Sequence, residues 1–334
     1  MESQKKILPR PESSIVSELE RIQGPAFAEY RRKWDEVNRF EFESDFPMFL
    51  HIETSYKCNF RCPMCVQGIP ELREKFGYEE AMTTERISKI LAEAQKYNCP
   101  SISFQGDNEP FLIRDIVHWF ELAAQHGFLD IMVNTNGSIM TERLAEQIIK
   151  SGLTRIRFSL DAITEETYSK IRLGGVFEKT MRNIDLFLRK RKELNAELPK
   201  VGVNFVRMKE NQHEVDDFVA YWNDRVDYVV IQDFMTPDPE GDFEHLSGSR
   251  EAKEDTFRCQ QPWQRLYIRG NGEVTPCCAM FSSYLKLGEL GDKSLKEIWD
   301  SPDAKELRKL HAEGRFHENE ICRKCSKSSG YEVE

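Results

Sequence analysis

The sequence predicts an α/β protein with a largely parallel β-sheet, followed by a smaller, cysteine-rich unit. From Met48 onward, short apolar stretches alternate six times with stretches of helical periodicity, an alternation typical of parallel sheets whose strands are joined by helices. After about Pro237 this rhythm ends, and five of the nine cysteines follow. A chain of 334 residues is long enough for one large domain and a second, smaller one.

Periodicity defines the expected elements of the first domain. Apolar residues three and four positions apart, such as Ile87, Ile90 and Leu91, indicate helices that pack one face on the sheet. Because such crossovers are right-handed, the six strands are expected to curl toward a barrel. The expected strands are 49–53, 101–105, 131–134, 156–160, 201–207 and 228–232. The expected helices are 85–97, 115–126, 142–151, 177–194 and 213–223.

Composition divides the chain into four parts. Residues 1–45 are charged and predict one or two short helices packed outside the main domain. The α/β domain is expected to span 46–236, and a linker rich in proline, glycine and serine to span 237–257. The last part, 258–334, is expected to form the second domain, with helices after a capping box at Ser294.

Charge, hydropathy and cysteine use narrow the class of protein. A net charge of −10 argues against a nucleic-acid-binding protein, which would show a basic face. No apolar run approaches the roughly 20 residues that span a bilayer, and the first residues lack a signal-peptide core, so no membrane partner is expected. Nine cysteines without a secretory segment indicate metal ligands in a reducing compartment, and we expect a cytoplasmic location.

Three cysteines follow the first expected strand with the spacing C-x₃-C-x₂-C. They are Cys58, Cys62 and Cys65, and no fourth cysteine lies nearby in the sequence. Three thiolates hold three corners of a four-iron cubane cluster, since a fully protein-bound cluster has four. The fourth iron is then open to a small molecule. Zinc usually takes four ligands that close a tetrahedron, so a lone triplet fits it poorly.

With Met64 ahead of the last cysteine, this motif resembles the signature of the radical S-adenosylmethionine (SAM) superfamily. The resemblance implies an open, partial (β/α)₆ barrel and a [4Fe–4S] cluster on Cys58, Cys62 and Cys65. It also implies that the open iron binds SAM, and that an electron from the cluster cleaves SAM to a 5′-deoxyadenosyl radical. This radical would take a hydrogen atom from the substrate. A flavodoxin- or ferredoxin-type protein is the expected reductant.

The candidate SAM contacts lie after the carboxyl ends of the next strands, where parallel α/β folds place their chemistry. In the family, the loop after the second strand reads Gly-Gly-Glu-Pro and binds the SAM amino group. Here it departs from that pattern and reads Gly-Asp-Asn-Glu-Pro from Gly106, so either Asp107 or Glu109 would receive the ammonium, with Asp107 favoured by register. Asn136 matches the position that contacts the nucleoside, and Ser159 the one near the methionyl carboxylate.

A second cysteine set lies in the C-terminal part. Expected strands at 263–269 and 273–276 form a hairpin around a Gly-Asn-Gly turn and bring Cys259 close to Cys277. The helices that follow can return the Cys-x-x-Cys pair to this hairpin, so that four thiolates converge. Such a site can hold structural zinc or an iron–sulfur cluster. The pair is Cys322 and Cys325.

This region resembles the SPASM/Twitch extension of radical SAM enzymes. Its five cysteines match the shorter, α+β Twitch form with one auxiliary [4Fe–4S] cluster, which makes two [4Fe–4S] clusters in the chain. The four-cysteine spacing is similar to that of the aminocyclitol dehydrogenases of the butirosin pathway. Cys278 is left over: it is an inert neighbour, an alternative ligand, or a hydrogen-atom donor as in related epimerases.

The resemblance implies a reaction at a carbinol carbon of a sugar- or cyclitol-like substrate. Dehydrogenation, with the auxiliary cluster as electron acceptor, is the first expectation. The alternatives are epimerisation with Cys278 as hydrogen donor, peptide maturation, and a metal-binding scaffold without activity. A small substrate is favoured because 1–45 is too short for a leader-peptide-binding domain. Arg207, Gln232 and Asp233, at or after later strand ends, are candidates to face it.

Overall fold

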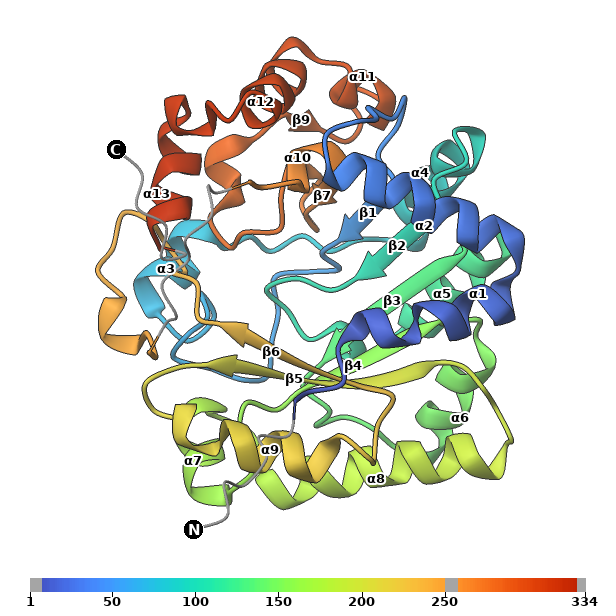
Figure 1. Cartoon of the computed structure of the whole chain (residues 1–334), viewed down its shortest axis with the longest axis vertical. Coiled ribbons are helices and arrows are strands. Elements are labelled where there is room, and N and C mark those ends of the chain that lie inside the picture. The colour runs from blue at the N-terminus through green and yellow to red at the C-terminus, as the bar shows by residue number, and fades with distance from the viewer. Residues whose placement is uncertain (1–7, 250–257, 329–334) are drawn as a thin grey trace.

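The computed structural model describes residues 8–249 and 258–328 and contains one nine-stranded sheet with the order β6-β5-β4-β3-β2-β1-β7-β8-β9 (Figure 1). The first six strands are parallel neighbours, which confirms the predicted α/β class. Each begins and ends within about two residues of the expected position. They are β1 (Phe49–Ile52), β2 (Ser101–Phe104), β3 (Asp130–Thr135), β4 (Arg155–Ser159), β5 (Lys200–Arg207) and β6 (Tyr228–Asp233).

The five expected crossover helices are present and cover the outer face of the curved sheet (Figure 1). Two of them begin at threonine caps, where Thr83 accepts a hydrogen bond from the Arg86 amide and Thr141 one from the Leu144 amide. Their buried faces carry the apolar residues that predicted them. They are α4 (Thr84–Lys96), α5 (Ile116–Gln125), α6 (Glu142–Lys150), α8 (Phe177–Glu193) and α9 (Val215–Trp222).

Two short helices of the α/β domain were not expected. α3 (Pro70–Phe76) follows the cysteine loop, and α7 (Glu165–Ile171) follows β4. Both are seven residues long, too short for a clear periodic pattern, although the cap at Thr164 was a local signal.

The N-terminal segment forms a 3₁₀ helix (Glu12–Ile15), α1 (Val16–Gln23) and α2 (Pro25–Asn38). In Figure 1 these helices lie across the side of the sheet where the parallel strands begin. Phe27 is buried in an apolar cluster that also contains Tyr228 of β6. The segment therefore packs against both the sheet and the C-terminal part of the chain.

The C-terminal unit extends the main sheet. β7 (Arg265–Ile268) pairs in parallel with β1, and β8 (Glu273–Thr275) and β9 (Gly288–Glu289) continue antiparallel. The strand expected over 263–269 begins only at Arg265, because α10 (Gln261–Gln264) precedes it with proline in its first turn.

Three helices complete the C-terminal unit: α11 (Leu295–Trp299), α12 (Pro302–Ala312) and α13 (Glu320–Ser328). The predicted capping box at Ser294 is confirmed. Of the expected linker, 237–249 is an irregular segment with one 3₁₀ turn, and 250–257 lies outside the described residues. Within 8–249 and 258–328, no helix has the length and apolar character needed to cross a bilayer.

Candidate active site

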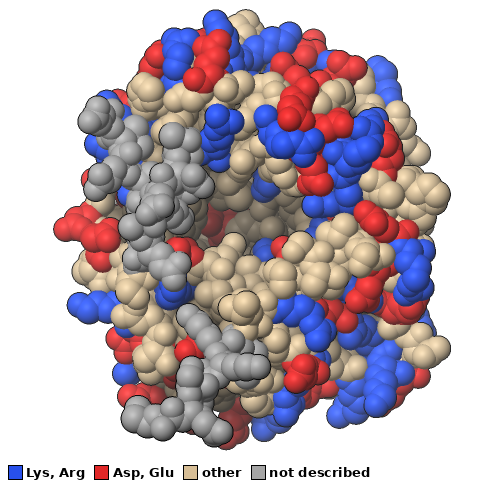
Figure 2. All heavy atoms as spheres, viewed as in Figure 1, with Lys and Arg blue, Asp and Glu red and all other residues tan. Residues whose placement is uncertain are grey.

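A cavity of about 550 Å³ lies inside the curved sheet toward the carboxyl ends of the strands. We call it the catalytic cavity. Figure 2 shows the hollow on the face that lies between β1 and β6 in Figure 1. All the residues predicted from the first cysteine motif and the SAM loops line this cavity: Cys58, Cys62, Cys65, Gly106, Asp107, Glu109, Asn136 and Ser159.

The three cysteines lie on a tight loop after β1. The Cys65 amide donates to the carbonyl of Cys62 at 3.1 Å, and the loop returns so closely that a side chain on Gly68 would lie 2.1 Å from the same carbonyl. Burial raises the pKa of all three thiols, that of Cys58 to about 11. Because buried thiolates are costly without a cation, this donor set fits iron that takes three thiolates from the protein.

In residues 8–249 and 258–328, no three His, Cys, Asp or Glu side chains lie close enough together to hold a single metal ion. The fit to a cluster therefore rests on the number and chemistry of the thiols and on their place in the cavity wall.

Arg172 is a lining residue that the sequence did not single out. Its Nη1 lies 3.8 Å from the sulfur of Cys62, and its Nη2 forms an ion pair with Asp161 at 2.5 Å. Asp161 lies two residues after the end of β4 and has a positive φ of 61°. A buried guanidinium beside a ligand sulfur stabilises negative charge there.

The two candidate acids of the SAM loop have different partners. Glu109 accepts hydrogen bonds from the Thr135 hydroxyl and the Asn136 amide, both at 2.7 Å, and from the Phe111 amide at 3.2 Å. Both of its oxygens are therefore used to hold the loop after β3. Burial raises the pKa of Glu109 to about 7, against the opposing effect of these bonds.

Asp107 has a free carboxylate. Its main chain is fixed, because its amide donates to Glu53 and its carbonyl accepts from Gln67 at 2.8 Å. Its carboxylate oxygens accept no hydrogen bond from the described residues. Burial and then the charge of Glu53 raise the pKa of Asp107 to about 8. Of the two acids, Asp107 is the one placed to receive a cation from the cavity.

The other two predicted contacts differ in how tightly they are held. The Asn136 Nδ2 donates to Asn59 of the cysteine loop at 2.9 Å, and its Oδ1 accepts from the amide and hydroxyl of Ser138. Asn136 thus ties the loop after β3 to the cysteine loop. Ser159 ends β4 with its side chain at the cavity wall.

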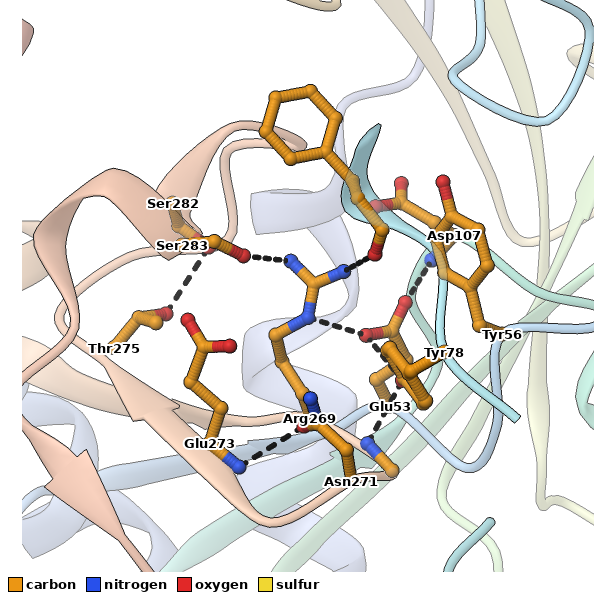
Figure 3. A network of polar contacts seen from close by, with 12 residues as sticks. Glu53, Tyr56, Tyr78, Asp107, Arg269, Asn271, Glu273, Thr275, Ser282 and Ser283 are labelled. Atoms are coloured by element: carbon orange, nitrogen blue, oxygen red, sulfur yellow. Dashed lines mark hydrogen bonds and ion pairs between the residues drawn. The ribbon is translucent and has the colours of Figure 1, made fainter. Parts of the chain in front are cut away.

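A buried polar network joins the SAM loop to the C-terminal unit (Figure 3). Its centre is Glu53, fully buried directly after β1, whose Oε2 lies 3.4 Å from Nε of Arg269. Tyr78 donates to the same carboxylate at 2.8 Å, and the Asp107 amide donates to its other oxygen at 3.0 Å. Burial raises the pKa of Glu53, and Arg269 opposes that shift.

Arg269 comes from the β7–β8 hairpin and is itself 1% exposed. Its Nη1 donates to Ser283 at 2.6 Å and its Nη2 to the Phe76 carbonyl at 3.1 Å. Gly106 sits against this network, since a Cβ there would lie 2.5 Å from the Tyr267 hydroxyl and 2.7 Å from Glu53. Only glycine fits at that point. Glu53 and Arg269 each end an apolar strand expected from the sequence, and this position of a charged residue was the one signal that could have indicated the network.

The four predicted auxiliary ligands lie near one another. The charges of Cys259 and Cys325 both act on Cys277 and on Cys322, and burial raises the pKa of all four thiols. Cys277 and Cys325 pack in the same apolar cluster as Cys65 of the first set. The second cysteine set therefore packs beside the cysteine loop, although none of its four members lines the catalytic cavity.

Cys278 differs from these four, because it lines the catalytic cavity. Its amide donates to Gln261 at 2.9 Å, and Nη1 of Arg265 lies 3.9 Å from its sulfur. Of the expected substrate-facing residues, Gln232 and Asp233 also line the cavity. Arg207 lies beyond them and holds Asp233 in an ion pair at 2.6 Å.

Comparison with known proteins agrees with this geometry. A family model described as "Radical SAM superfamily" matches residues 52–221, half of the chain. This chain belongs to the radical SAM superfamily. A second model, the SPASM "Iron-sulfur cluster-binding domain", matches residues 259–326. SAM and iron–sulfur clusters are therefore the cofactors of this radical SAM enzyme.

Among curated relatives, the GTP 3′,8-cyclase of Clostridium botulinum (strain Hall) is 30% identical over 173 residues, which cover 51% of each chain. The molybdenum cofactor biosynthesis protein moc-5 of Caenorhabditis elegans is 29% identical over 213 residues, 63% of this chain and 32% of the relative. The radical SAM chain thus spans about half or less of the length of these relatives.

Solved structures share the fold at low identity. BtrN in complex with AdoMet and 2-DOIA superposes with a TM-score of 0.54 at 14% identity, covering 84% of this chain and 93% of BtrN. SuiB of Streptococcus suis bound to S-adenosylmethionine gives 0.62 at 16% identity, covering 85% and 72%. These likenesses confirm the partial barrel with its C-terminal extension.

Exchanging the two acids of the SAM loop for amides should separate their roles. In Asp107→Asn, SAM binding should weaken about 10-fold or more, because a hydrogen bond to a charged group contributes roughly 1.5–3 kcal/mol. In Glu109→Gln, the melting temperature should fall, because an amide cannot accept all three bonds that Glu109 accepts. Equilibrium dialysis with SAM and thermal unfolding measure the two effects. Unchanged SAM affinity in Asp107→Asn would contradict the assignment.

Removing the cation of the buried network should destabilise the fold. Arg269→Met leaves Glu53 buried without its partner, which typically costs about 3–5 kcal/mol. The double variant with Glu53→Gln should recover part of that loss, because no charge is then left buried. Denaturant unfolding of the unmodified protein, Arg269→Met and the double variant gives their free energies of unfolding. Arg315→Met is the control, since its ion pairs with Glu313 and Glu318 are solvent-exposed. Equal losses of unfolding free energy in Arg269→Met and Arg315→Met would refute the role of the Glu53–Arg269 pair.

Proposed function

We propose that this radical SAM enzyme dehydrogenates a carbinol carbon of a small, sugar- or cyclitol-like substrate. The observation that carries the proposal is the apolar cluster shared by Cys65, Cys277 and Cys325, in which the second cysteine set packs beside the cysteine loop of the cavity. An auxiliary cluster on Cys259, Cys277, Cys322 and Cys325 would be the acceptor of one electron from the substrate radical.

The residues that line the catalytic cavity have different roles in this reaction. When bound, the first cluster and SAM supply a radical that takes a hydrogen atom from the substrate carbon. Cys58, Cys62 and Cys65 would hold three irons and leave the fourth for SAM, and the carboxylate of Asp107 would receive the SAM ammonium. Arg172 stabilises charge on Cys62 through the contact between Nη1 and sulfur.

Asp233 is placed to take the hydroxyl proton of the substrate. It lines the cavity, and Arg207 fixes its orientation through two hydrogen bonds to one oxygen. The oxidation then balances: a hydrogen atom leaves with the deoxyadenosyl group, a proton goes to Asp233, and one electron goes to the auxiliary cluster.

The polar lining supports a hydroxyl-rich substrate. Asn204 Oδ1 and Gln105 Oε1 are buried in the cavity wall and have no hydrogen-bond partner among the described residues. Side-chain amides both donate to and accept from hydroxyls. The curated relatives named GTP 3′,8-cyclase bear the name of a small-molecule reaction, which agrees with a small substrate.

A flavodoxin- or ferredoxin-type protein is the proposed electron donor.

Cys278 favours a second candidate function. Its position on the wall of the catalytic cavity is where a thiol could return a hydrogen atom to the substrate radical. The product would then be an epimer, and no net electron would be lost.

Cysteine variants test the proposal and separate the two reactions. Cys62→Ala should abolish the cleavage of SAM to 5′-deoxyadenosine by the anaerobic, reduced protein, whereas Cys99→Ala, which changes a lone buried cysteine outside the cavity, should not. Cleavage that persists in Cys62→Ala would contradict the proposed site. Mass spectrometry of the product then shows which of the two reactions the substrate has undergone.

For dehydrogenation, Cys278→Ala should still form a ketone two hydrogens lighter than the substrate. For epimerisation, the same variant should cleave SAM but lose product formation, and the unmodified enzyme should place solvent deuterium on the product carbon in D₂O. Deuterium on that carbon would replace the first candidate by the second.

A further inference from the structure

A second cavity of about 310 Å³ lies inside the same curved sheet, toward the amino ends of the strands. We call it the lower cavity. The N-terminal 3₁₀ helix and α2 form its outer wall (Figure 1). It meets the catalytic cavity at Gln105 and Asn134, which line both. Its charged lining residues are Glu12, Arg31, Arg155, Arg157 and Arg265.

Two carboxylates face the four guanidinium groups of the lower cavity. Asp130 forms a buried ion pair with Arg155, and Glu12 pairs with Arg155 at 2.7 Å and with Arg157 at 3.5 Å. Four positive charges against two negative ones leave an excess of two. This excess stands out in a chain whose net charge is −10.

The excess charge is spread over Arg157, which shares the carboxylate of Glu12 with Arg155, and over Arg265 and Arg31. Nε of Arg157 donates to the neutral Asn134 side chain at 3.1 Å. Arg265 lies over the ring of Phe49, donates to the neutral Gln264 side chain and lies 3.9 Å from the Cys278 sulfur through Nη1, while its buried Nε has no partner among the described residues.

Arg31 packs over Tyr30 and Trp34 and forms no ion pair within the described part of the chain. Partly buried cations that outnumber the carboxylates beside them are costly unless an anion completes the site.

We propose that the lower cavity binds a phosphate group of the substrate. Planar guanidinium groups bind phosphate oxygens in pairs, which suits Arg157 of β4 and Arg265 of β7, since both line the lower cavity. A substrate anchored there would pass between Gln105 and Asn134 and present its carbinol carbon in the catalytic cavity. The identity of the reacting carbon rests on the proposed function, whereas the phosphate site does not. Together they narrow the substrate to a phosphorylated sugar or cyclitol.

Calorimetric titration with inorganic phosphate tests the anion site directly. The anaerobically reconstituted protein, in phosphate-free buffer of low ionic strength, should bind phosphate saturably. Arg157→Gln should raise the Kd about 10-fold or more. Glu12→Gln should lower it, because the carboxylate that competes for Arg157 is removed. Arg182→Gln on α8, whose side chain is 73% exposed, is the matched control and should leave the Kd unchanged.

Two results would overturn the proposal: no saturable binding to the unmodified protein, or an equal Kd in Arg157→Gln and Arg182→Gln. Thermal unfolding checks that each variant is folded, and Arg265→Gln replaces Arg157→Gln should the latter not fold. The titration uses neither SAM nor reductant. Its failure would therefore leave the dehydrogenation proposal standing, whereas failure to form 5′-deoxyadenosine would affect only that proposal.

Discussion

The buried ion pair between Glu53 and Arg269 is the contact on which the geometry of the site depends. Glu53 stands directly after β1, between the sheet and the cysteine loop, and holds the amide of Asp107. Arg269 reaches it from the hairpin that carries the second cysteine set. Since β7 also pairs with β1 along its length, the C-terminal unit is fixed to the strand that leads into the radical-forming loop. One pair of charges thus sets the position of the SAM loop relative to the auxiliary cysteines.

The interior of the sheet is polar where a closed barrel would be filled with branched apolar side chains. His51 and Asn204 line the catalytic cavity, and Arg157 lines the lower cavity. Burial lowers the pKa of His51 to about 3, so this imidazole is neutral and adds no charge to the lumen. The open barrel has side-chain amides in the catalytic cavity and arginines in the lower cavity, and it provides room for both SAM and a polar substrate. The N-terminal helices close the lower end and supply Glu12, which limits the positive charge there.

Local sequence patterns predicted most of the fold but only part of the candidate site. The strands and long helices were predicted closely because apolar periodicity marks each of them, whereas α3, α7 and α10 are too short to show it. Cysteine spacing marked both thiol sets. The network of Glu53 and Arg269 joins residues far apart in the sequence, and no local motif reveals it. The charges of the lower cavity were hidden for the same reason, since they come from separate strands and from α2.

The central claim is that three thiolates leave one iron open beside Asp107, and that SAM binds there. Electron paramagnetic resonance of the anaerobic, dithionite-reduced protein tests it most directly, because a new ligand on the open iron changes the g-values of its cluster. Adding SAM should shift one of the reduced cluster signals, and the shift should be lost or weakened in Asp107→Asn. Spectra that are identical with and without SAM in the unmodified protein would contradict the claim.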